Sequence, residues 1–246
     1  MTIHLKTYSY YSKDSIRFYG ITQDPETHKY MMVLEYAENE NLREYLRINF
    51  NEINWKQKLE NLWELSLKLN IFGVLPYIAP EVLSGEEYTK AADVYSYGII
   101  AYEIVTGFPP YPDIPHDKDL AMKICNGLRP KIPFHTPKLI TRTIMRCWDA
   151  RVTHGPTSKE LHDEVYKYYY AEEFSANQES INTTITTTTI PLNYQTHPQA
   201  IYTSRLLNYS NLPKPKNEEN FERELEELTQ SMSDLCPSNS DLIDFF

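Results

Sequence analysis

The stretch Gly73–Gly107, GVLPYIAPEVLSGEEYTKAADVYSYGIIAYEIVTG, carries most of the information about the fold of this 246-residue chain. Two prolines interrupt its first half. Its second half is apolar on nearly every side, which is typical of a helix buried within a helical domain. Gly107 and the Pro-Pro pair that follows it are signals for the end of a helix. We therefore expect a long buried helix, ending near Gly107, at the centre of the fold.

Composition narrows the class of protein. Hydrophobic residues make up 41% of the chain, yet its mean hydropathy is −0.53, so we expect a packed region diluted by polar tail. The net charge of −10 disfavours nucleic acid as a partner. No signal-peptide pattern or membrane-length apolar stretch is visible, and the three cysteines form no C-x-x-C pair. These features predict a cytoplasmic protein with reduced thiols and no membrane segment.

Apolar periodicity predicts the other elements of the chain. The expected fold is mainly α with a small β portion (α+β). Turn residues separate two short apolar runs, which we assign to strands, and helical spacing dominates from there to residue 170. The expected ranges are strands within 16–36 and helices at 41–48, 55–69, 118–126, 138–147 and 157–170.

The last third of the chain differs in composition. Residues 171–216 are rich in Thr, Asn and Pro and predict a disordered linker. Residues 217–246 predict an acidic tail with one short helix, on which Phe221, Leu225, Leu228 and Met232 share a side. This helix is either solvated or a stub that binds a partner or forms a coiled coil. We favour the solvated helix, because two heptads are too few for a coiled coil.

Five short motifs occur in a fixed order, and together they resemble the protein-kinase family, in its tyrosine-kinase-like branch, over roughly residues 4–170. One of them is the A-P-E motif at the end of the activation segment. In chain order the motifs are Val33–Ala37 with Asn41-Leu42, Ala79-Pro80-Glu81, Asp93–Gly98, Thr106-Gly107 with Pro109–Tyr111, and Cys147-Trp148-Asp149.

The resemblance implies a partial kinase-like domain over 1–170. Residues 4–37 would be a remnant of the N-lobe with the hinge, and residues 38–170 a helical C-lobe. In the family, hinge backbone groups hold adenine, which corresponds here to Glu35, Tyr36 and Ala37. Scaffold roles fall to the A-P-E residues Ala79, Pro80 and Glu81, to Asp93, to Gly98 where a neighbouring element approaches, and to Trp148 in the lower core.

The residues that perform phosphoryl transfer in the family are absent from this sequence. It contains no G-x-G-x-x-G, no V-A-I-K lysine, no H-R-D and no D-F-G. The central helix passes almost directly to the segment before Ala79, which predicts an internal deletion near 69–73. We therefore expect no catalytic residue and no metal ligand, and ATP and Mg follow only from the resemblance. Genomic sequence across the junction would distinguish a degenerate paralogue from a mis-spliced or mispredicted product.

The deletion has consequences for the scaffold. In the family a late arginine pairs with the A-P-E glutamate, and here Gly155 takes the arginine's place. Glu81 is expected to lose its partner unless Arg146 or Arg151 substitutes. Asp93 loses the catalytic-loop backbone, and the helix from Tyr95 to Val105 is expected to expose apolar surface.

Three hypotheses about function follow. The first is a pseudokinase-like interaction or scaffold protein in signalling, with protein partners. The alternative is an ATP-dependent protein kinase acting on Ser, Thr or Tyr. The third is a helical adaptor that acts through its C-terminal tail.

Overall fold

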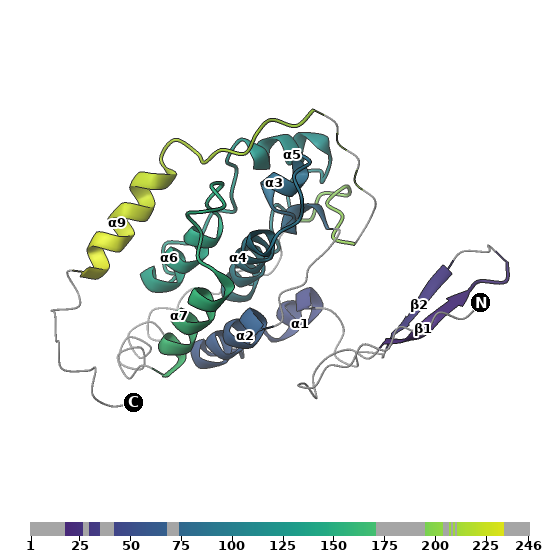
Figure 1. Ribbon diagram of the computed structural model, residues 1–246. Helices are drawn as coiled ribbons and strands as arrows, with labels where there is room; N and C mark the ends of the chain where they lie inside the picture. Colours follow the sequence, from purple (N-terminus) through teal and green to yellow (C-terminus); the bar gives the residue numbers. More distant parts are fainter. Residues whose placement is uncertain are drawn as a thin grey trace. The chain divides into compact units, whose positions relative to one another are not determined.

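A computed structural model describes residues 18–26, 30–34, 42–67, 74–170, 195–203, 207, 209 and 211–233. The chain divides into two compact units, Met1–Ile48 and Asn49–Phe246. The described part of the chain is mostly helical with one short β hairpin, so the expected mainly α fold class is confirmed (Figure 1). Among the described residues no helix is both long and apolar enough to cross a membrane.

The first unit contains an antiparallel hairpin of β1, Phe18–Gln23, and β2, Tyr30–Leu34. The register pairs Ile21 with Met32 and shifts at a bulge between Phe18 and Gly20. Helix α1, Leu42–Asn49, begins in this unit. Both strands lie within the expected range, and α1 begins one residue after the expected start of its helix.

The second unit is built around α4, Lys90–Thr106. Helices α2, Trp55–Leu67, α6, Lys138–Cys147, and α7, Ser158–Tyr170, pack against it (Figure 1). The span 95–105 is buried throughout except for Ile100, which is half-buried. The expected exposed apolar surface on this helix is therefore wrong, because α2, α6 and α7 together cover it.

The prolines before α4 start helical turns instead of interrupting structure. Pro76 lies in the 3₁₀ helix η1, Leu75–Tyr77, and Pro80 is the first residue of the short helix α3, Pro80–Leu83. Proline suits the first position of a helix, because the amide that it lacks has no intrahelical acceptor there. Sequence reasoning read these prolines as breaks and missed both turns.

Helix α5, Lys118–Cys125, begins at the expected residue and ends one residue before the expected end. The Asp117 side chain caps it by accepting hydrogen bonds from the amides of Asp119 and Leu120. Beyond its last turn, Gly127 adopts a φ of 103°, in the region that favours glycine. The asparagine and glycine after α5 therefore form a tight turn that leads the chain toward α6.

The tail returns to the second unit. Helix α9, Phe221–Ser233, packs against α6, and the described residues before it hydrogen-bond to the loops around α5. Phe221, only 6% exposed, joins the hydrophobic core, with Leu225 and Leu228 packed against that core. The expected solvated helix is thus a docked one. Residues 195–203 and 211–216 also differ from the predicted disordered linker, because specific hydrogen bonds hold them to the lobe.

Candidate functional site: the motif cluster and the docked tail

The A-P-E residues form the first turn of α3 and face the core. Ala79 is the N-cap residue in an extended conformation, and Pro80 and Glu81 begin the helix. All three are buried. The Cys125 thiol lies 3.6 Å from the carbonyl oxygen of Pro80, so the end of α5 packs directly on this turn.

Glu81 is a buried carboxylate, 6% exposed, beside an unfilled space. A cavity of about 10 Å³ separates it from Gly155 and Pro156 and is also lined by Cys147. Burial raises the pKa of Glu81, and the charge of Arg129 acts in the opposite direction. The described residues provide no ion pair for this carboxylate, in agreement with the loss of the late arginine.

Arg146 and Arg151 do not replace that arginine. The guanidinium of Arg146 bonds the Glu164 carboxylate on α7 at 2.5 Å. Arg151 bonds Asp149 at 2.9 Å, and these bonds hold the pKa of Asp149 below its ordinary value although burial acts against them. The substitution considered from sequence is therefore wrong for both arginines, because each already serves another carboxylate.

Gly98 lies where α4 meets the end of α6. A Cβ atom there would be 2.8 Å from the Cys147 Cβ and 2.8 Å from the Trp148 Nε1. These distances are shorter than ordinary van der Waals contact, so a side chain would push the helices apart. Trp148, 2% exposed, fills the space beneath α4. Sequence reasoning anticipated both the close approach and the buried tryptophan.

Asp93 and Ser96, from the same motif, have different surroundings. Asp93 is half-buried in the first turn of α4, where its Oδ1 accepts a hydrogen bond from the Tyr88 hydroxyl. The Ser96 hydroxyl is buried and lies 2.6 Å from the carbonyl oxygen of Tyr77. Ser96 therefore links α4 to η1, while Asp93 bonds a tyrosine only five residues earlier in the chain.

Lys58 is a buried cation that sequence reasoning missed. Its Nζ donates to the carbonyl oxygen of Val105 at 3.1 Å and lies 3.8 Å from the centre of the Phe50 ring. Burial lowers the pKa of Lys58 to about 8. The ammonium satisfies a carbonyl in the last turn of α4, where positive charge is favourable. It lies on the helical stripe of α2, and sequence alone offers no signal that separates it from exposed lysines.

The expected nucleotide-contacting residues Glu35, Tyr36 and Ala37 lie outside the described residues, as does the junction at 68–73. Within the described ranges no group of three or more His, Cys, Asp or Glu side chains is placed to hold a metal ion. We therefore derive no chemical step through MgATP.

The docked tail meets the lobe at two specific points. The Asn217 side chain accepts from the Ala150 amide at 2.7 Å and donates to the Asp149 carboxylate at 2.9 Å. At the second point the tail backbone crosses Gly127, where a Cβ would lie 2.5 Å from the Glu218 nitrogen. Gly127 thus serves both the turn after α5 and the approach of the tail, and only the first role is visible in sequence.

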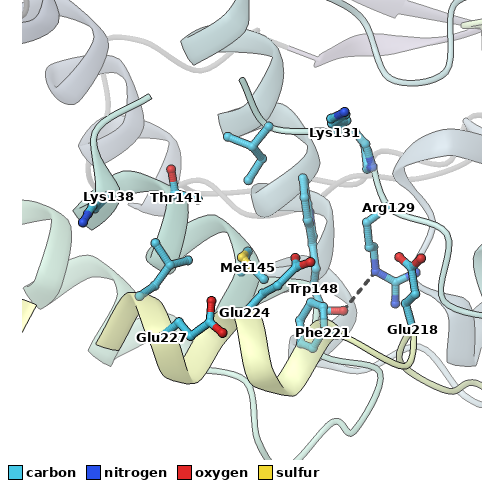
Figure 2. Close-up of a pocket in the computed structure, with 13 residues that line it drawn as sticks. Arg129, Lys131, Lys138, Thr141, Met145, Trp148, Glu218, Phe221, Glu224 and Glu227 are labelled. Atoms are coloured by element: carbon cyan, nitrogen blue, oxygen red, sulfur yellow. Dashed lines mark hydrogen bonds between the residues drawn. The ribbon is translucent and has the colours of Figure 1, made fainter. Parts of the chain in front are cut away.

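A groove of about 770 Å³ lies between α9, α6 and the loop after α5 (Figure 2). Met145, Trp148 and Phe221 give it an apolar floor. Figure 2 shows Glu224 and Glu227 on α9 at one side. Arg129, on the loop, donates from Nε to the Trp148 carbonyl oxygen at 3.0 Å. Of the residues that line this groove, Trp148 alone belongs to a family motif.

Comparison with known proteins finds similarity in the central part of the chain. Residues 70–165 match the model for the protein tyrosine and serine/threonine kinase family. This segment is similar to protein kinases. The kinase segment contains α3, α4, α5, α6 and most of α7, and therefore includes the A-P-E turn and the buried central helix.

Individual protein kinases are also similar to this chain. A probable serine/threonine-protein kinase of Dictyostelium discoideum, roco5, is 39% identical over 98 residues, covering 36% of this chain and 4% of that protein. The dual specificity protein kinase shkE of the same organism is 35% identical over 122 residues, covering 48% and 16%. A protein kinase and PP2C-like domain-containing protein of Arabidopsis thaliana is 34% identical over 111 residues, covering 38% and 17%. The chain thus spans less than a fifth of the length of these kinases.

Proposed function

We propose that this chain is a pseudokinase-like interaction module that acts in cytoplasmic signalling through protein partners and does not transfer phosphate. The connection between α2 and η1 carries the proposal. Only residues 68–73 separate Leu67 from Val74, and the family places its catalytic loop, metal-binding loop and most of its activation segment in that interval. Motifs that resemble the family stand on both sides of the connection.

Phosphoryl transfer depends on positioned charge more than on covalent chemistry. A protein kinase supplies a carboxylate that receives the hydroxyl proton and an Asn and Asp that hold magnesium. The H-R-D and D-F-G sequences that carry these groups occur nowhere in the chain. Conversely, Glu81, Gly98 and Trp148 support packing within the lobe. A lobe that keeps its packing residues without its catalytic residues is suited to binding.

Nucleotide titration tests this proposal against the active-kinase alternative. The whole chain is unfolded thermally over a range of MgATP concentrations, with matched concentrations of MgCl₂ and of ATP with EDTA as controls. We expect one cooperative transition whose midpoint does not depend on MgATP. A midpoint that rises with the logarithm of MgATP concentration, together with label transfer from γ-labelled ATP to the chain or a generic substrate, would refute the proposal.

The tail helix provides a second candidate function, that of an adaptor. The side of α9 that faces away from the core carries exposed carboxylates, among them Glu219 before the helix and Glu226 within it. Deleting residues 171–246 does not test this function cleanly, because the deletion also removes Phe221 from the core. Reversing the exposed charges with Glu219→Lys and Glu226→Lys leaves that packing intact.

The two functions predict different results for these reversed charges. Cross-linked partners are identified by mass spectrometry for the wild-type chain and for the double charge-reversal variant. If the lobe is the binding surface, both chains retain the same set of partners. If the tail is the binding surface, the variant loses these partners although its unfolding midpoint stays unchanged. Thermal unfolding followed by circular dichroism measures that midpoint.

A further inference from the structure

A short tail segment is hydrogen-bonded to the loop that follows α4. The segment is residues 195–203, and the loop is residues 108–116. The His116 amide donates to the Gln199 carbonyl at 2.9 Å, and the His197 amide donates to the Pro112 carbonyl at 2.8 Å. The Tyr202 hydroxyl donates to the Pro110 carbonyl at 2.9 Å. Segment and loop are therefore joined at three places along their length.

The His116 side chain lies between the two and is 1% exposed. Its Nδ1 is 2.9 Å from the Ile201 carbonyl oxygen in the segment, and its Nε2 is 3.0 Å from the Tyr111 carbonyl oxygen in the loop. The edge of the imidazole also meets the Tyr202 ring, with centroids 4.5 Å apart. One buried ring thus bridges the two segments through both of its nitrogens.

The two carbonyl partners determine which protonation state fits. A carbonyl oxygen can only accept, so each contact requires an N–H on the imidazole. A neutral imidazole carries one N–H and an imidazolium carries two. In the neutral form, one ring nitrogen presents a lone pair to a carbonyl oxygen, and two acceptors that face each other cannot form a hydrogen bond.

We propose that His116 is a pH-sensitive clasp, whose protonated ring ties the tail segment 195–203 to the loop 108–116. In the protonated state the ring donates to Ile201 and Tyr111 together. Loss of the proton removes one of these hydrogen bonds. The population of the state in which the segment is detached from the loop then increases. The clasp would couple the tail to the loop after the central helix, a surface that none of the kinase motifs uses for chemistry.

Other ionisable groups on the two segments act on this equilibrium. Asp113 lies within the loop and Asp117 directly follows it, and a negative charge near the ring favours its protonated form, whereas burial of the ring opposes that form. Burial raises the pKa of the Tyr111 phenol well above its ordinary value, so that group stays neutral. The segment carries His197, whose Nδ1 accepts a hydrogen bond from the Gln199 amide at 3.1 Å.

The direction of the pH effect follows from linkage. Because the proposed clasped state favours the protonated ring, that state holds the proton to a higher pH than the open state, whose reference is the pKa of about 6.5 of an ordinary histidine. The contribution of the clasp is then complete below the open-state pKa. It is lost as the pH rises through the clasped-state pKa.

Nuclear magnetic resonance on the whole chain tests the proposal. The side-chain ¹⁵N shifts of His116 are followed from pH 5 to 9, with amide hydrogen exchange of His116 and His197 corrected for its intrinsic pH dependence. We expect both ring nitrogens to be protonated at pH 6, and protection of the two amides to fall about tenfold across the titration, as for loss of one charged hydrogen bond. A neutral ring at pH 6, or protection that does not depend on pH, would overturn the proposal.

Three variants assign the effect to His116. Tyr202→Phe removes the bond to Pro110 without removing the imidazole, so protection should fall by the same factor at every pH. His197→Asn should keep the pH dependence, and a pH-independent result there would assign the switch to His197 and overturn the clasp. His116→Gln should abolish the pH dependence. If that variant does not fold, the wild-type ¹⁵N titration and the other two variants still decide the outcome.

Discussion

Helices α4 and α9 both pack on α6, and they do so in different ways. Helix α4 is apolar nearly all round and is enclosed by neighbouring helices. Helix α9 buries one stripe that starts at Phe221 and turns carboxylates to solvent. The apolar side chains around α4 stabilise its packing, because α4 buries apolar surface whichever of its sides faces a neighbouring helix. The second is held by single residues near its start, and each of them can be removed by one substitution.

The largest change in the free energy of unfolding is expected for a substitution at Phe221, where the tail enters the core. Phe221→Ala removes a ring that is 6% exposed and should lower the free energy of unfolding by about 3 kcal/mol. Urea denaturation followed by tryptophan fluorescence measures the change. Glu226→Ala, on the exposed side of α9, should shift stability by less than about 0.5 kcal/mol. If Phe221→Ala leaves the lobe's transition unchanged, the tail is an appendage and the two helices do not share a core.

A smaller loss is expected at Gly98, on the side of α4. Gly98→Ala places a Cβ 2.8 Å from the Cys147 Cβ, and this overlap should cost about 2 kcal/mol after the gain in helix propensity is included. Chemical denaturation of the variant measures the loss. Gly155→Ala provides the control, since its Cβ meets nothing closer than the Arg146 carbonyl oxygen at 3.4 Å. A stabilised Gly98→Ala protein would show that α4 tolerates movement away from Trp148.

Asn217 tests the tail's polar attachment. Asn217→Ala leaves the Ala150 amide and the Asp149 carboxylate each short of one hydrogen bond, which should cost about 1.5 kcal/mol. Thermal unfolding compares it with Asn126→Ala, whose exposed side chain bonds only the Met122 carbonyl within its own turn. Equal midpoints for the two variants would mean that the attachment of the tail does not depend on Asn217.

The smallest effect is expected at Glu81 and depends on pH. Its pKa in the folded state is raised by burial, so the folded chain binds this proton more tightly than the unfolded chain does. The carboxylate therefore costs no stability below the unfolded pKa of about 4.5 and becomes destabilising as the pH rises through the folded pKa. Glu81→Gln should add about 1 kcal/mol at pH 7 and nothing at pH 4.

Denaturation at the two pH values measures this difference, and Glu87→Gln, exposed on the following turn, is the matched control. Gly155→Arg extends the comparison by placing a guanidinium beside the cavity at Glu81. It should lower the pKa of Glu81 and reduce the advantage of Glu81→Gln at pH 7. An advantage of equal size at pH 4 and pH 7 would show that the ionised carboxylate carries no penalty.

Much of the fold could be predicted from local pattern. The helix ends at Asp117 and Gly107 follow from residue type and order, whereas the close approach at Gly98 and the buried Trp148 were expected from the resemblance to protein kinases. The candidate site was less predictable. Arg146 pairs with Glu164, and Arg151 pairs with Asp149. Each pairing depends on which carboxylate the fold brings near the arginine, and no periodic pattern in the sequence indicates it.

The sequence by itself determined that this chain contains a helical segment similar to protein kinases, centred on an apolar helix, without the motifs of phosphoryl transfer. Periodicity, capping and motif order act over a few residues, so they can be read along the chain. The tertiary structure alone decided that the tail belongs to the lobe. That outcome rests on contacts between residues far apart in the chain, such as Asn217 with Asp149 and His116 with Ile201, and these contacts exist only once the chain has folded.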